Sequence, residues 1–184
     1  MDIRHLEVDR IALSQQLPDW RTWARAAAVV LHLAPLQEAD WRVLLIWRPG
    51  GMKEHGGQVA CPGGGFDPRR DGDLWQTAVR ESGEEVGLKP RDEQRLGYLD
   101  PIYVAASGYT VLPCVVAWPR LPTVQAAPRE VEDWRWVSLE ELKRVEGRVW
   151  RRGEWVPDYP LAWRRVWGAT ARMLYLLMQA IEQA

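Results

Sequence analysis

The 184-residue chain has only two cysteines, Cys61 and Cys114, which are too few for a disulfide framework. A reducing compartment is therefore the simpler expectation, with both thiols buried and inert. No stretch reaches the roughly 18 consecutive apolar residues that a membrane span needs. The first ten residues also lack the apolar run of a signal peptide. These absences favour a cytoplasmic protein.

An excess of charge of one sign is also lacking. The chain has 24 Lys and Arg against 25 Asp and Glu, and its formal net charge is −1. We therefore expect no general attraction to nucleic acid or to an anionic membrane. The length suits one domain with a full core. We expect an N-terminal extension at residues 1–25 and one domain at residues 26–184, without repeats or linkers.

The most informative stretch is residues 63–88, where three glycines precede a predicted helix. Asp73 is a suitable N-cap for a helix from Leu74 to Val86, and Gly87 ends it. At the glycines, backbone N–H groups can meet substrate oxygens and unusual φ values are allowed. The apolar face of this helix is expected to pack on the core, and it consists of Trp75, Ala78, Val79, Ser82 and Val86.

Three carboxylates lie on the opposite face of this predicted helix, turned away from the core. Glu81, Glu84 and Glu85 are three or four residues apart, so their side chains are neighbours. Like charges this close repel one another, and a divalent cation between them would remove the repulsion. Mg²⁺ and Mn²⁺ prefer carboxylate oxygens and commonly bridge to phosphate. The pattern therefore indicates metal-assisted cleavage of a phosphate anhydride.

The sequence from Arg80 to Leu88, RESGEEVGL, resembles the box of the Nudix hydrolases, a glycine-led loop followed by R-E-small-x-E-E-x-G-apolar. The resemblance implies an α/β fold, an α/β/α sandwich with a mixed central sheet and a long C-terminal helix. It also implies a Mg²⁺ or Mn²⁺ cofactor held by Glu81, Glu84 and Glu85. Arg80 is then expected to fix a catalytic glutamate in place, completing the catalytic set.

The front of the box departs from the usual spacing. The family has a glutamate eight residues before the arginine, and here Gly72 stands at that position. Asp71 and Asp73 flank it, so the loop is one or two residues longer than usual. This departure weakens any role for the first acidic position and leaves the helical carboxylates unaffected.

A second signature lies upstream, at Leu44–Arg48 and Met52–Gly64. It resembles that of the coenzyme A diphosphatase branch, L-L-T-x-R-x(3)-L-R-x-H-x-G-Q-V-x-F-P-G-G, and Ser107–Pro113 and Arg165–Ala171 agree with the same branch. The resemblance implies hydrolysis of coenzyme A or its thioesters to 3′,5′-ADP and 4′-phosphopantetheine. The residues expected to bind this substrate are Arg48, Lys53, His55, Gly63 and Gly64.

Two alternatives stay open. The substrate could be another nucleoside diphosphate derivative, such as ADP-ribose, a dinucleotide or an NTP. A Nudix fold can also serve as a non-catalytic nucleotide-sensing module, which the glycine at position 72 favours. We expect the general base to be a glutamate of the helical cluster, or Glu130 or Glu132, either of which could instead be a late metal ligand. In either case the partner is a small nucleotide, coenzyme A-like in the preferred reading, and a homodimer is left open.

Hydrophobic patterning predicts the remaining elements. Residues 148–160, rich in Trp, Arg and Pro, are expected to form a loop, and Ser138 with Glu141 a capping box. Trp163 and Trp167 would anchor one face of the last helix. The predicted strands are Ala26–Leu33, Arg42–Trp47, Gln58–Cys61, Leu96–Val104, Val111–Trp118 and Trp134–Val137. The further predicted helices are 9–16, 20–25 and Leu161–Glu182.

Overall fold

The computed structural model describes residues 7–37, 40–51 and 56–183. Two sheets and three α-helices account for most of this part of the chain. The large sheet holds β1 (Ala26–Pro35), β2 (Trp41–Trp47), β3 (Val59–Ala60), β4 (Gly63–Gly65), β5 (Arg95–Tyr98), β6 (Ile102–Val104), β7 (Tyr109–Ala117) and β8 (Asp133–Ser138). The small sheet holds β9 (Gly147–Arg151), β10 (Glu154–Pro160) and β11 (Arg165–Val166). The helices are α1 (Leu74–Val86), α2 (Leu139–Val145) and α3 (Gly168–Glu182).

The large sheet is mixed, as expected. Its strand order is β3-β2-β1-β7-β5, and β1 pairs in parallel with β7, whereas its pairings with β2 and β4 are antiparallel. β2 and β4 share one edge of β1: Leu33 is opposite Val43, and Val29 is opposite Gly63. The sheet therefore splits along this edge, and the split exposes the glycine strand β4 to helix α1.

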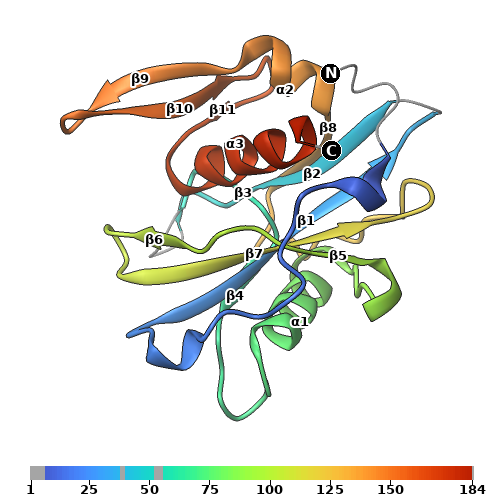
Figure 1. Cartoon of the computed structure of the whole chain (residues 1–184), viewed down its shortest axis with the longest axis vertical. Coiled ribbons are helices and arrows are strands. Elements are labelled where there is room, and N and C mark those ends of the chain that lie inside the picture. The colour runs from blue at the N-terminus through green and yellow to red at the C-terminus, as the bar shows by residue number, and fades with distance from the viewer. Residues whose placement is uncertain (1–6, 38–39, 52–55, 184) are drawn as a thin grey trace.

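Helices cover both faces of the sheet, α1 on one and α3 on the other (Figure 1). The α1 face buries Leu74 and Ala78 against β1 and β7, and the α3 face buries Leu174 and Leu177. Each fully buried leucine contributes about 1.5–3 kcal/mol. The predicted α/β/α sandwich is confirmed. None of the helices in the described ranges is long and apolar enough to cross a membrane.

Helix α1 is fixed at both ends by the predicted residues. The Asp73 carboxylate accepts the N–H of Gln76 at 2.8 Å, which makes it the N-cap. Gly87 ends the helix with a φ of 72°, a left-handed conformation that glycine adopts without strain. The helix is thus held at the two points that set the direction of its carboxylates.

A buried polar chain ties the middle of α1 to the sheet. Trp118 Nε1–H donates to His32 Nδ1 at 3.0 Å, so the proton of the neutral ring is on Nε2, which lies 2.8 Å from Ser82 Oγ. The Ser82 hydroxyl in turn donates to the Leu88 carbonyl at 2.7 Å. Burial lowers the pKa of His32 to about 3, so the ring stays neutral. These bonds fix the depth at which α1 lies on β1.

The two helices predicted before β1 are wrong. Only short 3-10 turns form there, at Val8–Arg10 and Trp20–Thr22. Between them Ser14 forms an antiparallel bridge with Tyr98, exchanging N–H···O bonds of 3.0 and 2.9 Å. Because the edge of β5 supplies these backbone partners, the segment satisfies its hydrogen bonds without coiling. Ile11 and Trp20 are each 7% exposed, so the segment adds to the core.

The predicted loop at residues 148–160 is instead the β9–β10 hairpin. Its turn residues, Arg152 and Gly153, have φ values of 49° and 88°. Positive φ at both positions suits a two-residue hairpin turn, because it matches the twist of the strands. Trp150 and Trp155 pair across the strands with ring centroids 5.5 Å apart.

The last helix is shorter than predicted and begins at Gly168. Before it, β11 pairs with the end of β10, Tyr159 opposite Val166, and Val166 is fully buried. Trp163 and Trp167 therefore lie outside the helix, and Trp163 Nε1–H donates to Asp133 at 2.8 Å. The prediction that these two tryptophans form an anchoring face of the last helix is wrong, because the segment before Gly168 pairs with β10 as a strand and does not join the helix.

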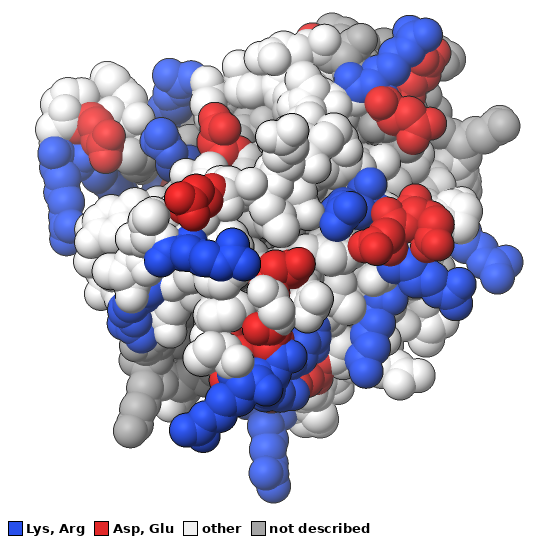
Figure 2. Space-filling model, turned by 60° about the horizontal axis from the view of Figure 1, so that its bottom comes forward, with Lys and Arg blue, Asp and Glu red and all other residues white. Residues whose placement is uncertain are grey.

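Two smaller expectations also need correction. The stretch predicted as one strand, Leu96–Val104, is two strands, β5 and β6, each antiparallel to β7. Ser138 is the N-cap of α2, but its side chain makes no capping hydrogen bond, so the capping box is absent. The face shown in Figure 2 carries acidic and basic side chains close together, in line with the formal net charge of −1.

Candidate active site

The glycine triplet forms strand β4 beside β1, where there is little room for side chains. A Cβ on Gly63 would lie 2.4 Å from the Ala28 carbonyl oxygen, and a Cβ on Gly64 would lie 2.5 Å from the Glu81 carboxylate. Both distances are far below van der Waals contact. Glycine is required at position 63, where the clash is with the backbone of β1, whereas a side chain at position 64 would displace the Glu81 carboxylate.

Arg80 is the centre of a cluster at the start of the site. Its guanidinium donates to both carboxylate oxygens of Asp71, from Nε at 2.7 Å and from Nη2 at 2.8 Å. Nη1 donates to Glu81 at 2.5 Å and to Glu84 at 3.2 Å, while Nη2 also reaches the Gly65 carbonyl at 3.1 Å. One arginine thus joins the loop, the glycine strand and two of the helical carboxylates. Arg70 forms a further ion pair with Glu84.

Asp71, next in sequence to the position of the usual first glutamate of the box, is the loop carboxylate that pairs with Arg80. Besides Arg80, it accepts the Thr77 hydroxyl at 3.0 Å and the Asp67 N–H at 3.0 Å. Burial alone would raise the pKa of Asp71, but these hydrogen bonds and the charge of Arg80 together hold it below its usual value. Sequence reasoning missed this residue because the longer loop puts Gly72 at the expected position. A carboxylate next to that position was the available signal.

Glu85 does not turn away from the core, contrary to the prediction. Its side chain is 1% exposed, pairs with Arg48 at 2.8 Å and accepts the Gly63 N–H at 2.9 Å. Arg48 also donates to the Gly63 carbonyl at 3.0 Å. The residues after β2 and the strand β4 cover this side of α1, which the periodicity of the helix alone cannot reveal. Burial raises the pKa of Glu85 to about 7, although Arg48 and the Gly63 N–H lower it.

Glu81 lies between the two ends of the site, which are the Asp71–Arg80 pair and the Glu85–Arg48 pair. Burial raises its pKa, and the neighbouring charges of Glu84 and Glu130 raise it further, while Arg80 acts in the opposite direction. Glu130, considered above as a ligand or base, is half-buried, and its charge reaches Glu81. Glu132, the other candidate, is exposed.

The donor set has the chemistry of a site for a hard divalent cation. Several carboxylates gather in a partly buried place, and their mutual repulsion adds to the raised pKa values of Glu81 and Glu85. A bound cation would favour the ionised forms that burial disfavours. As placed, no three acidic, His or Cys side chains of the described residues converge on one point. Binding therefore requires the glutamates to turn from their arginine partners.

The remaining predicted residues have different positions. Lys53 and His55 lie outside the described residues. Arg48, Gly63 and Gly64 do come together with Glu81 and Glu85, as described above. Tyr109 stacks under the Arg25 guanidinium, 4.0 Å from the ring centroid, outside the carboxylate cluster.

Cys61 and Cys114 are buried free thiols, as expected. Burial raises the pKa of both, to about 12 for Cys61, so neither is poised as a nucleophile.

Comparison with known proteins agrees with this geometry. Residues 23–159 match the NUDIX domain. The Nudix hydrolase NudL of Photorhabdus laumondii, itself named uncharacterized, is 34% identical over 164 residues, 86% of each chain. The peroxisomal coenzyme A diphosphatase ndx-8 of Caenorhabditis elegans is 36% identical over 117 residues, which are 63% of this chain and 50% of that one.

Among solved structures, the NUDIX domain of Shewanella oneidensis NrtR, complexed with ADP ribose, aligns with a TM-score of 0.60 at 17% identity. The alignment covers 91% of this chain and 94% of that one, and it shows a shared fold. The extent of the domain match and the identity to NudL are decisive for the family. The chain belongs to the Nudix family, as a hydrolase of nucleoside diphosphate derivatives.

Proposed function

We propose that the protein hydrolyses the diphosphate bond of coenzyme A or its thioesters, releasing 3′,5′-ADP and 4′-phosphopantetheine or its acyl form. The observation that carries this proposal is the carboxylate cluster of α1, packed against a glycine strand and crossed by Arg48 and Arg80. The choice of coenzyme A is supported by the signature at residues 44–64 and by the similarity to the worm coenzyme A diphosphatase.

In this proposal Glu81, Glu84 and Glu85 hold Mg²⁺ or Mn²⁺. When bound, the cation neutralises phosphoryl oxygens and lowers the pKa of a coordinated water. The chain supplies the placement: Arg80 fixes the loop, the glycine strand and two glutamates relative to one another. Arg48 keeps a cationic group beside Glu85, at the edge where substrate phosphates would lie. A glutamate of the cluster or Glu130 accepts the proton from the attacking water.

The test is a substrate panel of coenzyme A, acetyl-coenzyme A, ADP-ribose, NADH and ATP, each with and without Mn²⁺. We expect turnover of the coenzyme A compounds at the highest kcat/KM, with 3′,5′-ADP and a 4′-phosphopantetheine compound as products. Higher kcat/KM on ADP-ribose, NADH or ATP would refute the choice of coenzyme A and leave diphosphate hydrolysis standing.

A nucleotide-sensing role is the second candidate, since the NrtR domain of the same fold is complexed with ADP ribose. The glycine at position 72 was its sequence argument, and Asp71 weakens that argument by supplying a carboxylate to Arg80. Nucleotide binding without turnover anywhere in the panel would favour this role. We also propose a cytoplasmic location, which the two buried free thiols support.

A further inference from the structure

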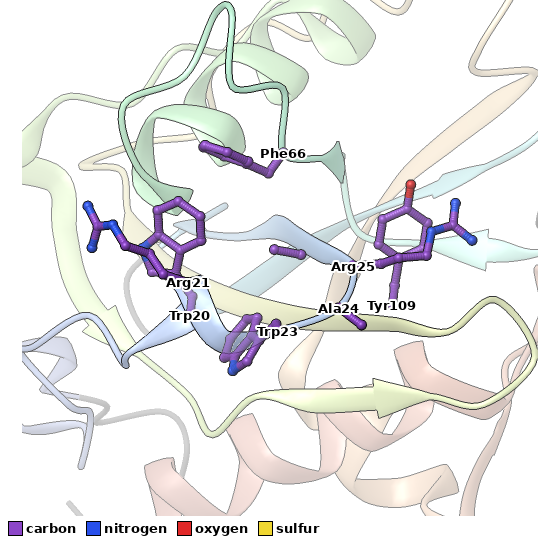
Figure 3. A pocket seen from close by; sticks show the side chains of 8 residues that line it. Trp20, Arg21, Trp23, Ala24, Arg25, Phe66 and Tyr109 are labelled. Carbon is purple, nitrogen blue, oxygen red and sulfur yellow. The ribbon is translucent and has the colours of Figure 1, made fainter.

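A cavity of about 390 Å³ lies outside the carboxylate cluster, where residues 20–26 meet Phe66 and Tyr109. We call it the aromatic pocket. Small-molecule sites typically have volumes of about 300–1,000 Å³. Figure 3 shows Phe66 and Trp20 on one side of the pocket and Tyr109 with Arg25 on the other, with the chain leading into β1 between them. Its walls therefore come from the N-terminal segment, from the residue after β4 and from β7.

The lining combines flat rings with cations. The rings of Trp20 and Phe66 are 4.5 Å apart at an angle of 55°, and Trp23 adds a third wall. Arg21 lies 4.9 Å from the Trp20 ring centroid, and Arg25 also donates to the Ser107 carbonyl at 2.6 Å. No Asp or Glu of the described residues lines the pocket. Such walls suit a flat aromatic base joined to a phosphate group, because rings stack on bases and guanidinium groups bind phosphate.

Strand β4 links this pocket to the carboxylate cluster. Gly64 contacts Glu81, the Gly65 carbonyl accepts from Arg80, and the Phe66 N–H continues the ladder by donating to Ala26 at 2.9 Å. At about 3.3 Å per residue, Phe66 lies roughly 7 Å along the strand from Gly64. A ribose joins the diphosphate to the base in a nucleotide, and it can span a gap of this size.

Packing alone does not account for all of these rings. Trp20 is 7% exposed and belongs to the core under α1. Trp23, Phe66 and Tyr109 are only half-buried, and all three line the pocket.

We infer that the aromatic pocket binds the nucleotide half of the substrate, with the adenine against Trp23 and Phe66 and the 3′-phosphate facing one of the two arginines, Arg21 beside Trp20 or Arg25 beside Tyr109. This inference rests on the proposed function, because it takes coenzyme A as the substrate. It assigns the N-terminal segment a part in choosing the substrate: a compound without a base, or without the extra phosphate, loses contacts here.

The first experiment removes the rings and keeps apolar bulk. Trp23→Leu and Phe66→Leu are made in the full chain, and the affinity for 3′,5′-ADP and for 4′-phosphopantetheine is measured by calorimetry. Loss of one base–ring contact should weaken 3′,5′-ADP about tenfold, within the range known for stacking. The affinity for 4′-phosphopantetheine, which has no base, should change less than about twofold. Trp155→Leu on β10, where the side chain is 62% exposed, is the matched control and should change neither.

The second experiment tests the cations, with Arg21→Gln and Arg25→Gln. The wild type should prefer 3′,5′-ADP over 5′-AMP, and at least one variant should reduce this preference about fivefold or more. Circular dichroism confirms folding of each variant. Full preference in both variants would overturn the phosphate assignment.

The outcomes separate the two proposals. Unchanged affinity for 3′,5′-ADP in both leucine variants overturns the pocket, even where the wild type hydrolyses coenzyme A. Ring-dependent binding of 3′,5′-ADP by a wild type that does not hydrolyse coenzyme A supports the pocket and refutes the proposed function. If one leucine variant fails to fold, the other variant decides.

Discussion

Asp71 and Glu85 lie at opposite ends of the candidate site and differ in one instructive way. Both side chains are 1% exposed and both pair with an arginine, Asp71 with Arg80 and Glu85 with Arg48. Burial disfavours the charged form of each. Yet the pKa of Asp71 is held below its usual value, whereas that of Glu85 is raised to about 7.

Two differences account for this: Glu85 lies deeper in the protein, so burial acts on it more strongly, and it has fewer donors than Asp71. Asp71 receives two N–H groups from Arg80, one from Asp67 and the Thr77 hydroxyl, which together outweigh burial. Glu85 receives one arginine and one backbone N–H, and the charge of Glu81 adds repulsion. A carboxylate with a full set of donors is a fixed structural anion. One with fewer donors can still gain from a cation or a proton, which is the property a reacting site needs.

The largest effect on activity is expected at Glu85, the carboxylate with fewer donors. Glu85→Gln should lower kcat/KM by about 10²- to 10⁴-fold, the range for loss of a catalytic acid–base or ligand group. The melting temperature should change little, because burial already disfavours the charged form of Glu85, and glutamine keeps an acceptor for Arg48 and for the Gly63 N–H. The control is Glu140→Gln at an exposed position of α2. Activity close to wild type would dismiss the role of Glu85.

At Asp71, the carboxylate with the full set of donors, we expect the main effect to be on the free energy of unfolding. Asp71→Asn leaves the Arg80 charge with a weaker partner, and breaking a buried ion pair costs about 3–5 kcal/mol. We expect the lower end of that range in urea unfolding, together with reduced turnover. Asp73→Asn is the matched control two residues away, and since asparagine caps helices as well as aspartate, it should cost less than about 0.5 kcal/mol. Equal costs for the two variants would contradict the comparison.

The buried chain beneath α1 predicts a dependence of stability on pH. His32 has a pKa of about 3 in the folded protein and an ordinary pKa of 6.5, so below pH 6.5 unfolding takes up a proton. As the pH is lowered below 6.5, this residue should therefore decrease the free energy of unfolding by up to about 1.4 kcal/mol for each pH unit. Its contribution is fully present above pH 6.5.

His32→Gln should remove about one proton from this dependence. Urea unfolding between pH 7.5 and 4.5 measures the slope for the wild type and the variant. An unchanged slope would show that the imidazole does not stay neutral on folding.

The smallest effect should come from the β9–β10 hairpin. Trp150→Leu removes an edge-on aromatic pair at a side chain that is 60% exposed. Such pairs contribute about 0.5–1.5 kcal/mol beyond burial, and the exposure favours the lower end. Thermal unfolding checks this value, and kcat/KM should not change. A large loss of activity would show that the hairpin contributes to the site, and the contrast between the hairpin and the carboxylate cluster would not hold.

The sequence predicts the elements whose signals are local. Apolar runs predict β1 and β2, and the N-cap at Asp73 with the glycine after its end predicts α1. All three predictions were confirmed. The β9–β10 hairpin was missed because its Trp and Arg side chains hide the alternation. The Arg152–Gly153 turn was its one local sign.

The site was harder to predict from the sequence than the fold, because two of its features depend on how the chain folds in three dimensions. The burial of Glu85 depends on Arg48 and β4, which come from distant parts of the chain. The part played by Asp71 depends on how the longer loop folds back, with the Asp71 N–H bonded to the Asp67 carbonyl at 2.8 Å. Neither the spacing of the box nor the helical period contains this information.

The most direct test of the central claim, that the α1 carboxylates form a divalent-cation site, is Mn²⁺ binding followed by electron paramagnetic resonance. The wild type should bind Mn²⁺, and Glu81→Gln and Glu85→Gln should each weaken that binding at least about tenfold while Glu140→Gln leaves it unchanged. Equal Mn²⁺ affinity in all four proteins would contradict the account.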